Sequence, residues 1–177
     1  MYPDVSIVPL NGKTPRIHES AFIAPGCRII GDVEIGPDVS IWYNCVLRGD
    51  VNFIRIGART NIQDGSVIHV DSPAPPKPDG FPTIIGEDVL VGHLAMVHGC
   101  VIEDRGFVGL GAIVMSDAHI ESDGMLAAGD ELDINKDHAG ILEKLNRVID
   151  RHGITVTGIG IGHDGHICRT DDLAASI

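Results

Sequence analysis

The sequence has few of the residues and segments that mark several large classes of protein. Aromatic residues are only 4% of its 177 residues, although 44% are hydrophobic and 22 are glycine. This composition favours many thin layers of Val, Ile, Leu and Ala over a core packed around large rings. No apolar run approaches the roughly 20 residues that cross a membrane, so we expect no membrane contact. The first residues lack a basic region followed by an apolar one, so we expect no secretory signal and a cytoplasmic protein.

Positive charge and paired cysteines are also scarce. Lys and Arg number 13 against 25 Asp and Glu, which gives a formal net charge of −12. Such a surface repels phosphate backbones and anionic membranes, so nucleic-acid binding is disfavoured. The four cysteines, Cys27, Cys45, Cys100 and Cys168, form no CxxC pair. We therefore expect buried free thiols in a reducing compartment.

What the sequence does have is a repeat of six residues. Aliphatic anchors recur at this spacing in four runs, which are separated by three extra residues, eleven extra residues and one deletion: Ile23, Ile29, Ile35, Ile41, Leu47; Ile56, Ile62, Ile68; Ile85, Val91, Val97; and Ile102, Val108, Val114, Ile120, Leu126. A period of six fits neither an amphipathic helix nor a hairpin meander. It is typical of a parallel β-helix, in which three hexads make one triangular coil of 18 residues. We predict five coils from Ile23 to Ile120, with a sixth opening at Leu126.

The segments outside the repeat complete a predicted all-β protein with a C-terminal helix. Residues 1–20 are interpreted as an N-terminal lead-in and residues 21–130 as the β-helix. The insertion SPAPPKPDGFP between Ile68 and Ile85 holds five prolines and is predicted to be a loop, either functional or a tolerated surface excursion. After Gly129 the period stops, and residues 131–177 are predicted to hold a helix over 137–151 followed by a divergent tail.

Two histidines and an arginine fall on one column of the predicted β-helix. His69 follows anchor Ile68 and His98 follows anchor Val97, 29 residues apart; without the eleven inserted residues the separation is 18, one full coil. Arg48 follows anchor Leu47 and lies 21 residues before His69. Without the three inserted residues this separation is also 18, so Arg48 lies on the same column. The side chains should therefore stack and point outward. Imidazole is a good ligand for zinc, so this column is a candidate metal site.

A third histidine, His93, lies two residues after anchor Val91, near the corner before the face of His98. A bend separates the two, so a tetrahedron is hard to close within one chain. The simplest solution is a trimer, in which His69 and His98 of one subunit meet His93 of a neighbour. Three histidines leave the fourth position for water, as in catalytic zinc sites. The alternative is that these histidines are only outward-facing residues of the repeat.

Three segments carry a specific resemblance: LRGD at 47–50, NIQDGSVIH at 61–69 and VGHLAMVHGC at 91–100. They resemble the gamma class of carbonic anhydrases and related bacterial proteins of the transferase hexapeptide superfamily, over about residues 10–130. The resemblance implies a left-handed β-helix and a homotrimer. It also implies a zinc site shared between subunits, with His69, His93 and His98 as ligands and with iron or cobalt possible in the same place. The implied reaction is the hydration of carbon dioxide to bicarbonate by a zinc-bound hydroxide.

The resemblance also implies roles for five further residues. Gln63 and Asn61 would position the metal-bound water and bicarbonate, while Arg48, Asp50 and Asp64 would hold the subunit interface and the surroundings of the ligands together. Zinc lowers the pKa of its water to about 7, and a neutral amide can orient that water without adding a competing charge. For Asn61 and Asp64 the alternative is turn chemistry at a corner of the coil.

The chain departs from the family pattern in two places. The loop after the first histidine lacks the glutamates thought to shuttle protons, and its nearby acids are Asp71 and Asp79. From about Asp130 the sequence also diverges, so family residues beyond that point are not carried over.

Two other functions compete with a zinc lyase. One is a hexapeptide-repeat acyltransferase or thioesterase, which would need a histidine without metal partners and a basic patch for coenzyme A phosphates. The histidine trio and the net charge of −12 argue against it. The other is a non-catalytic, metal-binding trimeric scaffold, which the altered loop and tail allow.

Overall fold

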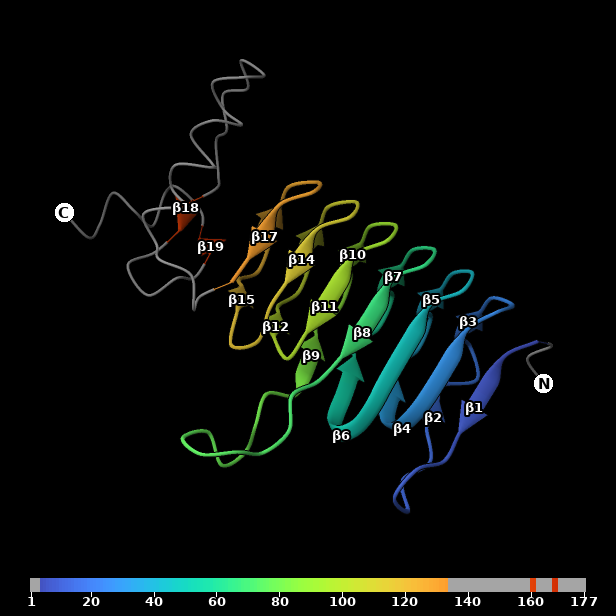
Figure 1. The fold of residues 1–177 in the computed structure, drawn as a ribbon. Coiled ribbons are helices and arrows are strands. Elements are labelled where there is room, and N and C mark those ends of the chain that lie inside the picture. The colour runs from blue at the N-terminus through green and yellow to red at the C-terminus, as the bar shows by residue number, and fades with distance from the viewer. Residues whose placement is uncertain (1–3, 134–159, 162–166, 169–177) are drawn as a thin grey trace.

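The computed structural model describes residues 4–133, 160–161 and 167–168. They form a stack of short strands that winds as a left-handed parallel β-helix (Figure 1). The strands are β1 (Ser6–Val8), β2 (Arg16–Ile17), β3 (Phe22–Ile23), β4 (Arg28–Ile35), β5 (Ser40–Ile41), β6 (Val46–Ile56), β7 (Asn61–Ile62), β8 (Val67–His69), β9 (Thr83–Ile85), β10 (Leu90–Val91), β11 (Met96–His98), β12 (Val101–Ile102), β13 (Phe107–Val108), β14 (Ile113–Val114), β15 (His119–Ile120), β16 (Met125–Leu126), β17 (Glu131–Leu132), β18 (Gly160–Ile161) and β19 (Ile167–Cys168).

The strands stack in register on three faces. Face 1 holds β3, β5, β7, β10, β13 and β16; face 2 holds β1, the first parts of β4 and β6, β8, β11, β14 and β17; face 3 holds β2, the second parts of β4 and β6, β9, β12 and β15. The pairings within the three faces are parallel, and β18 pairs antiparallel with β19, which joins β15. We call the bends corner 1–2, corner 2–3 and corner 3–1 after the faces that they join.

The predicted anchors line the core of the β-helix. Each of them, from Ile23 to Leu126, is at most 6% exposed. Fully burying one such side chain stabilises the fold by about 1.5–3 kcal/mol. The repeated layers of Ile, Val and Leu can therefore stabilise the fold without a core of aromatic side chains. Cys27, Cys45 and Cys100 are buried free thiols, as expected, while the side chain of Cys168 lies outside the described part.

Both insertions in the repeat lie at corner 2–3, where they leave the stacking of the faces intact. The three extra residues form a bulge within β6, where the register with β4 shifts between Gly31 and Val33. The eleven extra residues form the long loop between β8 and β9 that projects from the solenoid in Figure 1. Its base is closed by an antiparallel bridge between Asp71 and Phe81.

The solenoid has about seven coils, against the five to six that the hexad spacing predicts. Part of the difference arises because β1 and β2, within residues 1–20, already pair with β4. At the other end β17 continues the stack beyond Leu126 by pairing with β14. The predicted helix over residues 137–151 lies outside the described residues. No helix in the part that the structure describes has the length and apolar character needed to cross a membrane.

Candidate metal centre

The histidine column stands on face 2, near corner 2–3. His69 of β8 and His98 of β11 are register partners, and Arg48 of β6 is the partner of His69 on its other side, as the 18-residue spacing predicts. The nitrogens Nδ1 of His69 and Nε2 of His98 face each other at 3.1 Å. Their rings meet edge to face, with centroids 4.9 Å apart. The repeat thus places two imidazole nitrogens close enough to bind the same metal ion.

Asp50, in the bulge of β6, holds His69 from the other side of the ring. Its Oδ1 lies 2.9 Å from Nε2 of His69, and its Oδ2 accepts a hydrogen bond from the Arg48 guanidinium. Burial works against ionisation of Asp50, but the hydrogen bonds from His69 and Arg48 outweigh it and hold the pKa of Asp50 below its ordinary value. Arg48 also approaches Nδ1 of His69 at 3.4 Å. Because Arg48 can only donate, this contact fits an unprotonated Nδ1.

His98 is held by a residue that the sequence reasoning missed. Its Nδ1 lies 2.9 Å from Oγ of Ser116, at corner 2–3 of the next coil. Burial lowers the pKa of His98, and the neighbouring His69 acts in the same direction. Extending the column leads to Met115, the residue after anchor Val114, so the repeat alone does not point to Ser116, which lies one residue further along.

His93 lies apart from this pair, in the turn between β10 and β11 at corner 1–2. Its Nδ1 pairs with Oδ2 of Asp64 at 2.9 Å. Asp64 and His93 are 29 positions apart, like His69 and His98. Without the eleven inserted residues they are one coil of 18 residues apart, so they also lie above one another in the stack. Among the described residues, no three His, Cys, Asp or Glu side chains converge in a way that could hold a metal within one chain.

Leu94, the next residue, has an unusual backbone. Its φ is +59°, and its side chain is 73% exposed. The same turn position in the other coils is occupied by residues that tolerate the left-handed region, namely Gly26, Asn44, Gly65, Gly111 and Gly129. A leucine in this conformation is strained, so an exposed apolar side chain is held beside His93 at a cost in stability.

The two amides expected to contact substrate lie on the face 1 side of corner 1–2. Asn61 donates from Nδ2 to Oγ of Ser40 at 2.7 Å, and its Oδ1 is buried without a hydrogen-bond partner. The N–H of Gln63 donates to the carbonyl of Val91 at 2.9 Å, which stacks Gln63 against the next coil. Within one chain, the corner separates both amides from the pair His69 and His98.

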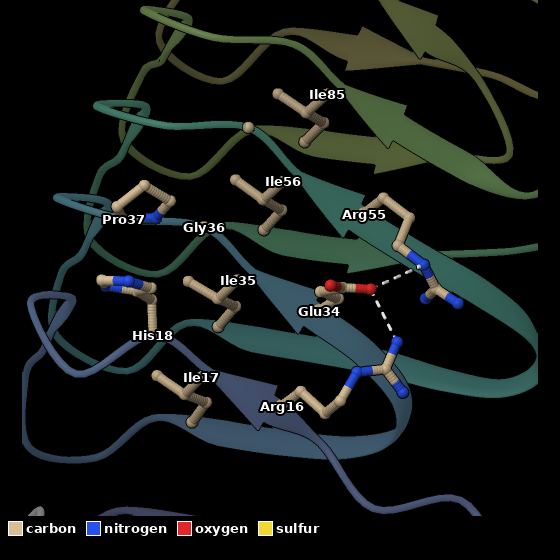
Figure 2. Close-up of a pocket in the computed structure, with 11 residues that line it drawn as sticks. Arg16, Ile17, His18, Glu34, Ile35, Gly36, Pro37, Arg55, Ile56 and Ile85 are labelled. Carbon is tan, nitrogen blue, oxygen red and sulfur yellow. Dashed lines mark hydrogen bonds and ion pairs between the residues drawn. The ribbon is translucent and has the colours of Figure 1, made fainter.

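Two hollows lie beside the β-helix. One of about 500 Å³ runs between face 3 and corner 3–1, over stacked isoleucines that include Ile35 and Ile56 (Figure 2). At its side Glu34 pairs with Arg16 at 2.6 Å and Arg55 at 3.4 Å. None of the predicted site residues lines it. The other, of about 240 Å³, includes Asp50 and Asn52 of the bulge and therefore borders the histidine column.

The solenoid is similar in sequence to proteins named carbonic anhydrase. Over 119 residues the chain is 50% identical to gamma carbonic anhydrase 1, mitochondrial, of Arabidopsis thaliana, an alignment that covers 66% of this chain and 42% of that protein. Over 114 residues it is 45% identical to the carbonic anhydrase of Geobacillus kaustophilus, covering 64% of this chain and 59% of that protein. The chain thus spans about half the length of these relatives.

A protein family and a solved structure that match the chain both agree with the hexapeptide-repeat fold. The bacterial transferase hexapeptide (six repeats) family matches residues 14–49. The crystal structure of a hexapeptide transferase family protein from Anaplasma phagocytophilum superposes with a TM-score of 0.66 at 45% identity, covering 72% of this chain and 71% of that one. Relatives of the chain therefore carry names of both kinds, carbonic anhydrase and transferase.

Proposed function

This chain belongs to the gamma-class carbonic anhydrase family of hexapeptide-repeat proteins, and from that premise we propose that it is a metal-dependent enzyme that interconverts carbon dioxide and bicarbonate. The proposed metal is zinc, with iron or cobalt able to occupy the same ligands, in a site shared between subunits of a homotrimer. The observation that carries the proposal is the pair His69 and His98, whose facing nitrogens are 3.1 Å apart.

The donor set fits a tetrahedral metal ion. Two ligands at about 2.0–2.1 Å from zinc at the tetrahedral angle are about 3.3–3.4 Å from each other, close to the observed separation. The other nitrogen of His69 pairs with Asp50, and that of His98 with Ser116. His93 likewise pairs through Nδ1 with Asp64. Each ring thus has one nitrogen held by a carboxylate or a hydroxyl, the usual arrangement of histidine ligands. The other nitrogen could bind a metal, and at Nδ1 of His69 the metal would replace the 3.4 Å contact with Arg48.

The proposed roles of the other residues follow from their positions. A bound zinc ion supplies a Lewis acid that makes a strong nucleophile from water near neutral pH. Asp50, Asp64 and Ser116 orient the imidazoles. Gln63 positions the reacting water through a neutral amide, and the unpartnered, buried Oδ1 of Asn61 accepts a hydrogen bond from water or from bicarbonate. Arg48 neutralises Asp50 beside the site.

A trimer would complete the site and cover apolar surface next to it. Between the histidine column and corner 1–2, face 2 carries an outward stack of aliphatic side chains, Val46, Val67, Met96 and Ile113. Met96 and Ile113 are 37% and 38% exposed, and Leu94 and Leu110 project from the corner. Packing corner 1–2 of one subunit against face 2 of the next would bury both apolar surfaces and bring His93 to His69 and His98.

Mixed trimers test the shared site. His69→Ala removes a ligand from the face 2 side, and His93→Ala removes the ligand from the corner. In a cyclic trimer that contains both variants, one interface joins an intact face 2 to an intact corner. We expect each variant alone to bind little zinc and to hydrate carbon dioxide slowly, and coexpressed subunits to regain about one zinc ion per trimer together with hydration activity measured by stopped flow. Coexpressed trimers that bind no more zinc than the separate variants would contradict the shared site.

The named transferase relatives support a second candidate, acyl transfer or thioester hydrolysis. A non-catalytic, metal-binding trimeric scaffold is the third. Turnover of acetyl-coenzyme A by metal-free protein would favour the second, and full zinc occupancy without carbon dioxide hydration would favour the third. A cytoplasmic location remains a prediction from the sequence.

A further inference from the structure

We propose that Asp71 and Ser116 position the imidazole of His98, holding its Nδ1 hydrogen toward Ser116 so that the lone pair of Nε2 faces the metal site. The base of the proline-rich loop would thereby set the orientation of a metal ligand that lies on a different coil. This inference rests on the proposed metal centre, in which Ser116 orients His98. It adds that Asp71 sets the direction of the Ser116 hydrogen and thereby the tautomer of His98.

The contacts around Ser116 fix the direction of its single hydroxyl hydrogen. Oγ lies 2.9 Å from Nδ1 of His98 and 3.3 Å from Oδ2 of Asp71. An ionised carboxylate only accepts hydrogen bonds, so the Ser116 hydrogen goes to Asp71. The lone pair on Oγ then accepts the hydrogen on Nδ1 of His98. The result is a chain from carboxylate to hydroxyl to imidazole that leaves Nε2 of His98 unprotonated.

The opposite arrangement is incompatible with a metal. If Ser116 donated to Nδ1 of His98, the imidazole hydrogen would sit on Nε2, the atom 3.1 Å from Nδ1 of His69. That hydrogen would occupy the place of the metal. The oxygens of Ser116 and Asp71 would also face each other without a hydrogen between them. Binding of a cation between the two imidazoles therefore requires the arrangement that Asp71 stabilises.

Hydrogen bonds at the base of the loop hold the backbone at Asp71. The N–H of Asp71 donates to the carbonyl of Phe81 at 2.8 Å, and the N–H of Phe81 donates back at 3.3 Å. Asn52 in the β6 bulge donates from Nδ2 to the carbonyls of Asp71 at 3.0 Å and Asp79 at 2.8 Å. The turn of the loop is also tied down, since Lys77 pairs with Asp117, the residue after Ser116, at 3.0 Å. These bonds fix the backbone of Asp71 at a position from which its carboxylate reaches Ser116.

A glycine beside the serine provides the space for this approach. A Cβ at Gly99 would lie 2.9 Å from both Oγ of Ser116 and Cβ of Phe81, closer than Cβ contacts normally come. The absence of a side chain at position 99 thus allows the next coil and the loop to meet at His98. The N–H of Gly99 is itself fixed at 2.9 Å by Oγ1 of Thr83, which in turn donates to the carbonyl of His69.

Zinc affinity provides the first test. Partners that fix the outer nitrogen of a metal-bound histidine typically contribute about 10–100-fold to metal affinity. Competition with a chelator should therefore show zinc binding about 10-fold or more weaker in Ser116→Ala, with Ser116→Thr close to the wild type because it keeps the hydroxyl. Ser122→Ala is the matched control, since the Ser122 hydroxyl donates to Glu103 on face 3. Equal affinity of wild type and Ser116→Ala would overturn the positioning role while leaving the metal centre in place.

The second test does not depend on bound metal. In His69→Ala protein the nitrogen that faces Nε2 of His98 is removed, so nitrogen NMR of labelled histidine reports how Ser116 and Asp71 affect the His98 tautomer without that neighbour. At a pH of about 8, above the ordinary histidine pKa, we expect the hydrogen on Nδ1. Adding Ser116→Ala should move it largely to Nε2. If the wild type binds no zinc, the proposed function fails and this shift still decides the inference; an unchanged tautomer would overturn it.

Discussion

Replacing Leu94 with Asn separates the strain of one turn from the stability of the proposed trimer. Leu94 has a φ of +59° and is 73% exposed in the single chain. The left-handed region costs a leucine about 1–2 kcal/mol, most of which Asn avoids, so the fold of each subunit should gain about 1 kcal/mol. At the interface, the same substitution should weaken the trimer because the leucine side chain is lost. Burying the exposed fraction of a leucine contributes about 1–2 kcal/mol per subunit, or about 3–6 kcal/mol per trimer.

These magnitudes predict a measurable change in assembly. At about 1.4 kcal/mol per factor of ten, the trimer dissociation constant should rise by about 10²–10⁴. In a monomer–trimer equilibrium the midpoint concentration varies as the square root of that constant, so it should rise by about 10–100-fold. Sedimentation equilibrium over a range of concentrations measures the midpoint, and thermal melting at low concentration measures the stability of the subunit.

Two control variants isolate the two effects. Leu110→Asn, on the same corner and 52% exposed, should weaken the trimer without the gain in subunit stability, since Leu110 is not in the left-handed region. Ile84→Thr, on face 3 and 38% exposed, should leave the midpoint unchanged. An unchanged midpoint for Leu94→Asn would refute the placement of Leu94 in the interface. A lower melting temperature of its monomer would refute the strain.

Three further predictions concern the site, an ion pair and the core. Gln63→Ala should keep zinc and the trimer but lose about 10–100-fold in carbon dioxide hydration, measured by stopped flow; full activity would contradict its proposed role. Burial opposes the ionisation of Asp32, but Arg55 and Lys13 outweigh this effect and lower the pKa of Asp32. The stability that Asp32 contributes is therefore present above its ordinary pKa of about 3.9 and is lost as the pH falls through its pKa in the folded protein. Urea unfolding should therefore show Asp32→Asn less stable than the wild type at neutral pH, with the difference closing below about pH 4, and a difference independent of pH would exclude this linkage. Ile68→Ala, at a fully buried anchor beneath His69, should lower the free energy of unfolding by about 2–5 kcal/mol, whereas Ile84→Ala, 38% exposed, should cost less than half as much; similar losses would contradict the placement of the core.

The features that could be predicted from the sequence are those that repeat. Each anchor depends only on its own hexad, so the six-residue spacing predicts which residues are buried. Subtracting the inserted residues from the sequence separations predicts the stack of Arg48, His69 and His98. The same count also pairs Asp64 with His93, which lie 29 positions apart. In these cases the sequence position alone determines which residues are neighbours.

The features that could not be predicted depend on single side chains and on the ends of the repeat. The link from Asp71 through Ser116 to His98 requires the closure of the loop between Asp71 and Phe81, and hexad counting says nothing about loop closure. The strained backbone at Leu94 arises from a coil geometry that other coils satisfy with Gly or Asn. The early start of the solenoid at β1 was hidden because its residues lack the regular spacing.

The placement of both insertions at corner 2–3 means that chain length and angular position on this fold are partly independent. A segment that leaves and re-enters the same corner adds residues without rotating the later coils, so His98 stays over His69 despite eleven additional residues. Adding a single hexad within the stack would instead turn every later residue by one face, and adding three would restore the angle but move the later part of the chain outward by one strand spacing, about 4.8 Å. Loops between Asp71 and Phe81 of very different length are therefore compatible with the same two imidazoles, provided that the bridge at the base of the loop closes.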